Sequence, residues 1–102
     1  MGLTVVLESE DGTPIELIED QKNLLHQLLP QHDDDSYQIT RFIDWYGDTT
    51  INRLQIPLFL EEWARVSGRA NSAAERSLVD GIRRLAVRTQ DEVHTYLKFY
   101  GD

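Results

Sequence analysis

The sequence predicts an α+β fold in which a small mixed or antiparallel sheet, of three to five strands, has three helices packed on it. Three observations lead to this prediction. Short runs near both ends of the chain alternate apolar and polar residues with the period of two that is typical of strands. Three internal segments instead repeat apolar residues at helical spacing. Gly and Pro residues separate these runs, and the resulting order of elements favours helices packed on one face of a sheet.

The first 30 residues predict a hairpin and a helix. Residues 3–8 alternate and contain β-branched residues, so they predict a strand. The Asp-Gly-Thr-Pro sequence that follows favours a turn, after which residues 15–18 can pair back as a second strand. Asp20 suits a helix N-cap, four leucines after it lie on one helical stripe, and Pro30 ends that helix.

The middle of the chain predicts strands on either side of a turn. His32 and the three aspartates that follow it form an acidic segment. Residues 37–43 mix aromatic and β-branched side chains, which predicts a strand. Residues 46–48 interrupt that strand as a turn, and residues 49–52 either return as a strand or lead into the next helix.

The second half predicts two helices and a last strand. Residues 57–66 begin with Pro and repeat apolar residues at helical spacing. Ser72 and Glu75 have the form of a capping box at the start of the second helix. Gly81 lies on the apolar stripe of that helix, where a missing side chain lets another element approach closely. Residues 93–100 alternate strictly, so the chain is expected to end in a strand.

Length and composition narrow the possible classes of protein. At 102 residues the chain has the size of one typical domain, so we expect a single α+β domain over residues 1–102. The absence of Cys excludes disulfides, thiolate metal sites and thiol nucleophiles. No apolar run approaches the roughly 20 residues that span a bilayer, and the N-terminus lacks the pattern of a signal peptide. We therefore expect a cytoplasmic protein.

The charge of the chain is negative and unevenly distributed. The net charge of −8 argues against binding to nucleic acids or to acidic membranes, because both need a cationic surface. Residues 1–62 hold 13 acidic residues against three basic ones, a net charge of −10, whereas residues 63–102 carry +2. Such asymmetry can steer a basic protein toward one face. A solvated acidic surface that only keeps the protein in solution explains the same charge.

Two segments carry a resemblance to a known family. They are DWYGDTTINRLQIP at residues 44–57 and HTYLKFYGD at residues 94–102, less than a quarter of the chain. Together they resemble a family of small uncharacterised bacterial proteins with a YGDTxxNxLQxP signature, in which Pro usually occupies the position of Trp45. The resemblance implies a bacterial origin and a meaningful YGDT turn. It implies no activity, cofactor or partner.

The YGDT turn is the most specific candidate site. A loop of this kind can present convergent polar groups, and Asp44 and Asp48 could hold a cation or a basic side chain of a partner. The structural alternative is that Asp48 and Asn52 bind backbone amides in an Asx turn while Gly47 takes a positive φ. His32 lies beside three aspartates, but the segment lacks the spacing and the glycine of a calcium-binding loop, so we expect no metal there.

Two hypotheses on function follow. The first is a bacterial, non-enzymatic protein-binding module, of the immunity or antitoxin-like type, that uses an acidic face against a basic protein. Its expected partner-binding residues are Asp33, Asp34, Asp35, Asp44 and Asp48. The alternative is a small enzyme or ligand-binding protein with a pocket between the YGDT turn and the C-terminal strand. Its expected lining is Tyr46, Asp48, Asn52, His94 and Tyr96.

The first hypothesis is favoured because the sequence lacks the common catalytic and nucleotide-binding motifs. We therefore expect neither catalytic residues nor a cofactor. Self-association as a homodimer is a third alternative. The arginines of the last two helices could bind phosphate, but pairs such as Asp80 with Arg84 favour a salt-bridged surface.

Overall fold

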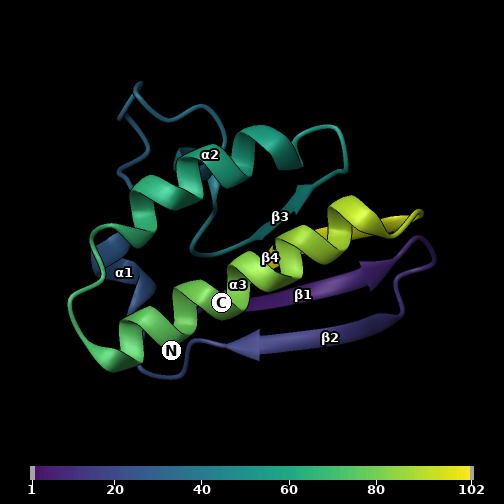
Figure 1. The fold of residues 1–102 in the computed structure, drawn as a ribbon, viewed down its shortest axis with the longest axis horizontal. Coiled ribbons are helices and arrows are strands. Elements are labelled where there is room, and N and C mark those ends of the chain that lie inside the picture. The colour runs from purple at the N-terminus through teal and green to yellow at the C-terminus, as the bar shows by residue number, and fades with distance from the viewer. Residues whose placement is uncertain (1, 102) are drawn as a thin grey trace.

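The computed structural model describes residues 2–101 and contains a four-stranded antiparallel sheet in the order β2-β1-β4-β3. The strands are β1 (Thr4–Ser9), β2 (Pro14–Glu19), β3 (Asp48–Ile51) and β4 (Thr95–Tyr100). β1 pairs with β2 and β4, so the first and last strands of the chain lie side by side in the middle of the sheet (Figure 1). The predicted α+β class is confirmed, with the antiparallel form of the sheet.

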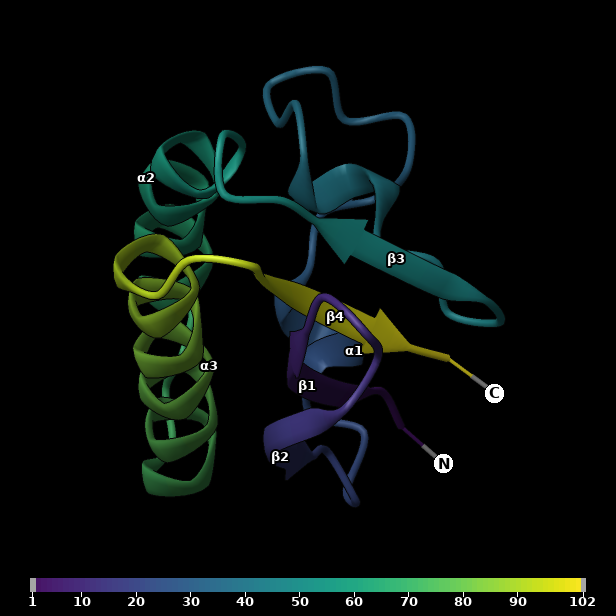
Figure 2. The ribbon, with the colours of Figure 1, turned by 90° about the vertical axis from the view of Figure 1, so that its right-hand side faces the viewer.

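The helices are α1 (Leu25–Leu28), α2 (Ile56–Ser67) and α3 (Ala73–Asp91), together with a short 3-10 helix, η1 (Thr40–Phe42). The two long helices, α2 and α3, lie together on one side of the sheet and leave its other face without a long helix (Figure 2). Within residues 2–101, no helix is both long enough and apolar enough to cross a membrane.

The core lies between the sheet and the two long helices. Its aromatic centre consists of Phe59 and Trp63 from α2, whose rings stack with centroids 5.1 Å apart, and Phe99 from β4. All three side chains are fully buried. The Trp63 indole Nε1 donates a hydrogen bond of 3.0 Å to the Val79 carbonyl, so its polar group is satisfied where α2 crosses α3.

Helix α3 begins and packs as the sequence predicts. The Ser72 hydroxyl accepts a hydrogen bond from the Glu75 N–H at 3.1 Å, which confirms the predicted N-cap. A Cβ added at Gly81 would lie 2.9 Å from Cδ1 of Ile18 on β2. The missing side chain therefore allows the close approach of strand and helix that the sequence led us to expect.

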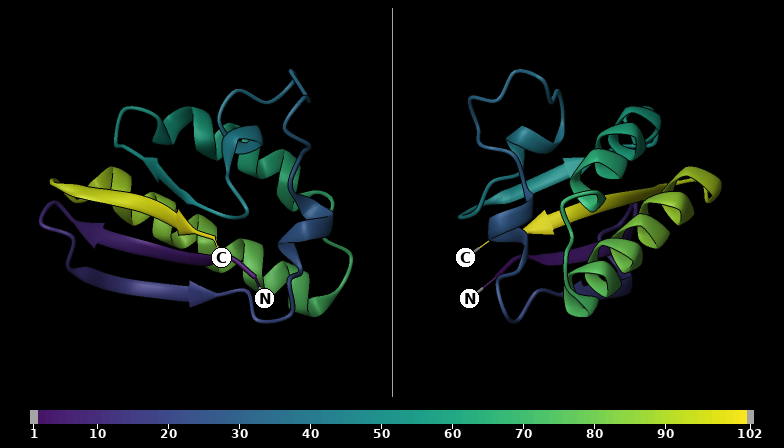
Figure 3. Two further views of the ribbon diagram at one scale, coloured as in Figure 1. Left: turned by 180° about the vertical axis from the view of Figure 1, so that it is seen from behind. Right: turned by 60° about the vertical axis from the view of Figure 1, so that its left-hand side comes forward.

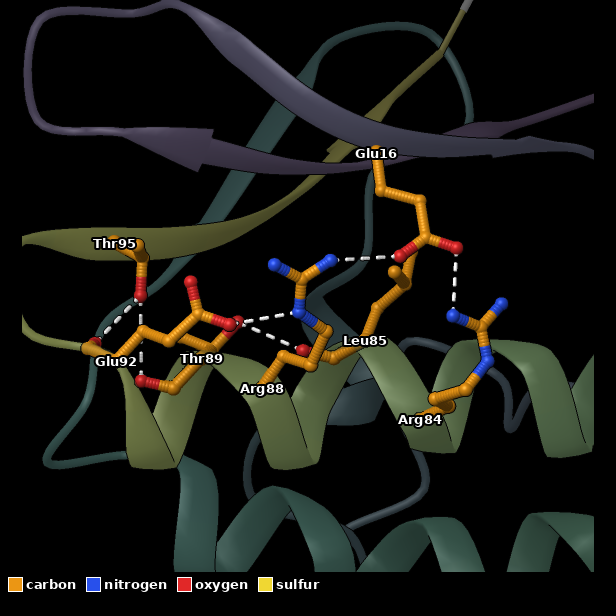
Figure 4. A network of polar contacts seen from close by, with 7 residues as sticks. All are labelled: Glu16, Arg84, Leu85, Arg88, Thr89, Glu92 and Thr95. Atoms are coloured by element: carbon orange, nitrogen blue, oxygen red, sulfur yellow. Dashed lines mark hydrogen bonds and ion pairs between the residues drawn. The ribbon is translucent and has the colours of Figure 1, made fainter.

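Ion pairs fix the edge strand β2 to α3. Arg84 and Arg88 reach from α3 to the Glu16 carboxylate, at 2.6 and 2.9 Å (Figure 4). The hydrogen bond from Arg84, the largest cause, and that from Arg88 hold the pKa of Glu16 below its usual value. The expected salt-bridged surface is thus present, with Glu16 rather than Asp80 as the partner of Arg84.

Three predicted elements differ from the structure. The strand predicted at residues 37–43 is wrong, because this segment is irregular except for η1. The helix predicted after Asp20 is shortened to the single turn α1; the Asp20 carboxylate still accepts hydrogen bonds of 2.8 Å from the N–H groups of Leu24 and Leu25. The last strand begins at Thr95 and not at residue 93, because His94 has a φ of 60°.

Candidate functional site

The connection between α1 and β3, residues 29–47, is the most unusual segment of the chain, and we call it the acidic loop. Its only regular structure is η1, and it projects away from the sheet (Figure 3). Connections longer than about 12–15 residues without their own regular structure are uncommon in compact domains, and they are usually either functional or disordered. Contacts with Glu62 and Arg65 of α2 hold this one in a defined conformation.

A buried carboxylate from α2 holds the centre of the acidic loop. Glu62 is 3% exposed, and its side chain accepts hydrogen bonds from three consecutive backbone N–H groups: Gln38 at 2.6 Å, Ile39 at 3.1 Å and Thr40 at 2.9 Å. The Thr40 hydroxyl adds a fourth donor at 2.8 Å. The amide groups that a strand would have paired with a neighbouring strand are therefore bound by one side chain, which explains why residues 37–43 do not form the predicted strand.

The electrostatics of Glu62 favour its ionised form. Burial by itself would raise the pKa of the carboxyl group, but the donors on Thr40, Gln38 and Ile39 outweigh burial and hold the pKa below its usual value. The four donors form charge-assisted hydrogen bonds that stabilise the ionised carboxylate in its buried position. Glu62 therefore has a structural function, as the group that holds the loop.

Two arginines, Arg65 of α2 and Arg69 just after the end of that helix, contact the chain before η1. The Tyr37 ring is buried, and the Arg65 guanidinium carbon lies 4.0 Å from its centroid. Arg65 also donates a hydrogen bond of 2.7 Å to the Ser36 carbonyl, and Arg69 donates one of 3.1 Å to the Leu28 carbonyl. These contacts combine cation–π attraction with hydrogen bonds to the backbone. They fix the residues just after the aspartate run, Ser36 and Tyr37, and the end of α1 that precedes the loop.

The YGDT turn is held by its own side chains and by the end of β4. The Asp44 carboxylate accepts a hydrogen bond from the Tyr46 N–H at 2.9 Å, which forms an Asx turn. The Gly101 N–H donates to the Gly47 carbonyl at 2.8 Å. A Cβ on Gly101 would lie 2.3 Å from the Trp45 carbonyl oxygen, so only glycine fits there. The two segments that carry the family resemblance therefore meet in space.

Two details of the expected turn are corrected. Asp44, and not Asp48, forms the Asx turn. Gly47 does not have a positive φ; a Cβ there would lie 2.8 Å from Oδ2 of Asp44, the side chain that forms the Asx turn. Asn52 does bind a backbone amide: its Oδ1 accepts from the Gln55 N–H at 3.1 Å, while Gln55 Oε1 accepts from the Asn52 N–H at 2.9 Å. This reciprocal pair lies just before α2.

The five predicted partner-binding aspartates divide into two groups. Asp34 binds the Ser36 N–H and hydroxyl at 3.1 and 2.6 Å, and these bonds lower its pKa; Asp44 forms the Asx turn. Asp33, Asp35 and Asp48 are exposed, and none of their side chains makes a hydrogen bond or an ion pair within residues 2–101. These three carboxylates are available to a partner.

The structure does not assemble the predicted pocket. Asp48 pairs with Tyr100 at one end of β4, whereas His94 precedes the other end and pairs with Glu10 at 2.6 Å. Tyr100 lies six positions after His94 along the extended strand, a distance of about 20 Å. Tyr46 is 83% exposed and Asn52 lies before α2. Of the five predicted pocket residues, only Asp48 and Tyr96 point to the same face of the sheet. Tyr96 lies four residues along β4 from Tyr100, the partner of Asp48.

Sequence reasoning missed a polar cluster on that face. Glu8 of β1 is 5% exposed, Lys98 Nζ lies 3.1 Å from its Oε1, and the Tyr100 hydroxyl donates to its Oε2. The hydrogen bond to Glu8 is the largest cause that raises the pKa of both Lys98 and Tyr100. Alternation along each strand gave the face of each residue, but the register between β1 and β4 was needed to bring the three together.

Sequence reasoning also missed a cleft beside the acidic loop, which we call the Trp45 cleft. It has a volume of about 310 Å³. The rings of His26 and Trp45 lie 5.3 Å apart and are tilted by 59°. His32 Nε2 is 3.2 Å from the Ile43 carbonyl oxygen. The lining residues are His26, Leu29, Pro30, Gln31, His32 and Trp45.

Neither a metal-binding group nor a similar protein identifies a function for this site. Within residues 2–101, no group of three or more His, Cys, Asp or Glu side chains could hold a metal ion. Comparison of the chain with protein-family models, with curated proteins and with solved structures gives no match. The resemblance to the YGDTxxNxLQxP family stays a prediction.

Proposed function

We propose that this chain is a non-enzymatic protein-binding module, of the immunity or antitoxin-like type, that binds a basic protein through its acidic loop. One observation carries the proposal: a long irregular loop is held by the buried Glu62 carboxylate while Asp33 and Asp35 remain free at its surface. Holding a loop in one conformation lowers the entropy of the chain, and here it also requires burial of a charged group. A surface that is ordered in advance loses less entropy when it binds a partner, so binding is a function that benefits from this conformation.

The charge of this surface fits a cationic partner. Asp48, at the start of β3, adds a third free carboxylate beyond the end of the loop. Negative charge on one part of a surface accelerates the approach of a basic protein and suppresses binding of acidic ones. Because the loop is already ordered, little further entropy is lost when the partner binds.

The first experiment identifies the partner. The tagged chain is used to capture proteins from a lysate of its source at low and at high ionic strength, and the captured proteins are identified by mass spectrometry. The proposal expects a stoichiometric basic protein that is lost at high ionic strength, because screening weakens attraction between exposed charges.

The second experiment tests whether position, and not total charge, matters. The variant D33N/D35N/D48N removes three exposed carboxylates from the proposed surface and spares Asp34 and Asp44, which hold the loop. The matched control, E10Q/D80N/D91N, removes three exposed carboxylates elsewhere, so both proteins have the same net charge. The proposal expects the first variant to lose capture and the control to retain it. Equal capture by the two variants would refute the proposal.

A further inference from the structure

We infer that an extended segment of the basic partner adds to the sheet at the outer side of β3, with a Lys or Arg side chain opposite Asp48. The inference rests on the proposed function and specifies how that partner binds. β3 is the last strand in the order β2-β1-β4-β3, so within residues 2–101 only β4 pairs with it (Figure 2). A strand edge of this kind can accept a strand from another protein.

The backbone groups of Asp48 and Thr50 point away from β4. The Gly101 N–H donates to the Gly47 carbonyl at 2.8 Å, and these two residues continue the register of β3 with β4. In an antiparallel pair of strands, hydrogen-bonded and non-hydrogen-bonded positions alternate. Every second residue after Gly47, beginning with Thr49, therefore bonds to β4. The N–H and C=O groups of Asp48 and Thr50 are directed outward.

Side chains bind the amides on either side of these two residues. The Tyr46 N–H donates to the Asp44 carboxylate at 2.9 Å. The Asn52 N–H donates to Gln55 Oε1, also at 2.9 Å. The two outward residues between them are exposed, and no side chain or other segment within residues 2–101 binds their backbone. The unpaired part of the edge is therefore a short, defined stretch that an extended segment of a few residues could pair with.

The charge at this edge favours a basic residue in the added strand. The Asp48 side chain is exposed and makes no ion pair within residues 2–101. Its neighbour on β4 is Tyr100, whose hydroxyl is bonded to Glu8. The nearby ammonium group of Lys98 also pairs with Glu8, at 3.1 Å. On an added strand, the side chain opposite Asp48 would lie on the same face at about 5 Å between Cβ atoms, so Lys or Arg there would meet an unpaired carboxylate.

Exposed apolar side chains are concentrated around β3. Within residues 2–101, four of the seven exposed large apolar side chains belong to residues 42–58: Phe42, Tyr46, Leu54 and Leu58. The Phe42 carbonyl accepts a hydrogen bond of 3.5 Å from the Thr49 hydroxyl, so η1 lies against the strand. Aromatic residues are enriched at the centres of protein interfaces. This region therefore has apolar surface that an added strand could cover.

Neither the other edge nor a second copy of the chain fits as well. β2 begins with Pro14 beside a shift in its register with β1, and both features discourage strand addition. A second copy at β3 would bring two acidic loops together, because the loop leads directly into Asp48. Two chains with a net charge of −8 each would repel one another there. A basic partner is attracted by the same charge.

Amide hydrogen exchange tests whether the edge is open and whether the partner closes it. In the free chain, the amides of Asp48 and Thr50 should exchange at least about tenfold faster than those of Thr49 and Ile51, which are bonded to β4. Equal protection of the four amides would overturn the inference. When the captured partner saturates the chain, exchange at Thr50 should slow by at least about tenfold. Unchanged exchange at Thr50 in the saturated complex would overturn it as well.

A proline substitution removes one outward donor without removing a bond to β4. Thr50→Pro deletes the outward N–H, and its ring obstructs the approach of another strand. Thr50→Val is the matched control, because it keeps the N–H and the β-branched shape. We expect Thr50→Pro to weaken binding of the captured partner at least about tenfold and Thr50→Val to change it about twofold or less.

A second variant keeps the test decisive if Thr50→Pro does not fold. An ester in place of the amide at Thr50, introduced by peptide ligation, removes the same N–H and leaves the side chain in place. It should weaken binding about fivefold, because one backbone hydrogen bond is lost. Full affinity of the folded Thr50→Pro variant, or of the ester variant, would overturn the inference.

The outcome is distinguishable from that of the proposed function. If the partner is lost with D33N/D35N/D48N but binds the folded Thr50→Pro variant at full affinity, the acidic surface binds it without strand addition and only the inference fails. If D33N/D35N/D48N and Thr50→Pro both lose the partner and Thr50→Val retains it, strand addition is supported. A dimer of the free chain that Thr50→Pro abolishes would assign the edge to a second copy and overturn the inference.

Discussion

The carboxylate of Glu62 and the backbone N–H of Thr40 are joined by a hydrogen bond of 2.9 Å across 22 residues of sequence. This contact, with those to Gln38 and Ile39, replaces the strand pairing that the composition of residues 37–43 favours. A side chain on α2 thereby determines the conformation of the acidic loop. Several measurable consequences depend on it.

Removing the Glu62 charge should loosen the acidic loop. Glu62→Ala leaves four buried or part-buried donors without their acceptor. A hydrogen bond to a charged group contributes about 1.5–3 kcal/mol, so we expect a loss of about 3 kcal/mol or more in the free energy of unfolding. Amide exchange should increase at residues 38–40. The exposed neighbour Glu61 supplies the control, Glu61→Gln, for which we expect a change of about 0.5 kcal/mol or less. Similar losses for both variants would contradict the assigned function of Glu62.

The stability of the chain should decrease as the pH falls below the ordinary carboxyl range. The pKa of Glu62 is lower in the folded chain than in the unfolded one, so its contribution is fully present above the unfolded pKa and is lost as the pH falls through the folded pKa. Glu62→Gln should therefore flatten the dependence of the unfolding free energy on pH below about pH 4.5. A dependence as steep as that of the unmodified chain would show that Glu62 does not contribute.

Two glycines should respond differently to substitution by alanine. At Gly101 the new methyl group would meet the Trp45 backbone carbonyl at 2.3 Å, and backbone cannot move aside easily. At Gly81 it would meet only the terminal methyl of Ile18, at 2.9 Å, while helix propensity improves by about 1 kcal/mol. Gly101→Ala should lower the melting temperature clearly and shift the NMR signals of the YGDT turn. Gly81→Ala should change stability little; the reverse order would contradict the close packing at the turn.

Tyr100 should ionise at a higher pH than a free tyrosine. The Tyr100 hydroxyl donates a hydrogen bond to the Glu8 carboxylate, and this hydrogen bond is the largest cause that raises the pKa of Tyr100. Ring-carbon NMR signals should show Tyr100 ionising at higher pH than tyrosine in a short unstructured peptide. Glu8→Gln should lower the pKa of Tyr100 toward the peptide value. If Tyr100 in the unmodified chain titrates like the peptide, the cluster on the sheet face is not formed in solution.

Local sequence patterns sufficed for much of the fold. Alternation identified β1 and β4, and the turn at residues 11–14 suggested β2. Apolar spacing identified α2 and α3, with the Ser72 cap at the start of α3, because all these signals arise within a few neighbouring residues. Residues 37–43 have the composition of a strand but not its structure. Their amides are bound by a carboxylate more than 20 residues away, and no local pattern reports such a distant acceptor.

The candidate site was predicted less completely than the fold. The sequence identified the aspartates and the YGDT turn, yet assigned the Asx turn to Asp48 instead of Asp44. It placed His94 near the turn because the sheet order was unknown, and the structure places it at the opposite end of β4. The Trp45 cleft combines residues from α1 and from both ends of the acidic loop, so its lining depends on tertiary packing that periodicity does not encode.

The association rate constant of the captured partner is the most direct measurement of whether the acidic loop is a binding surface. It is measured for the unmodified chain, for D33N/D35N/D48N and for E10Q/D80N/D91N, at low and at high ionic strength. We expect the loop variant to bind about tenfold more slowly at low ionic strength and to lose most of its salt dependence, because long-range attraction sets the rate. The control should change by about twofold or less. Equal rate constants for the two variants would contradict the proposal, since only total charge would then matter.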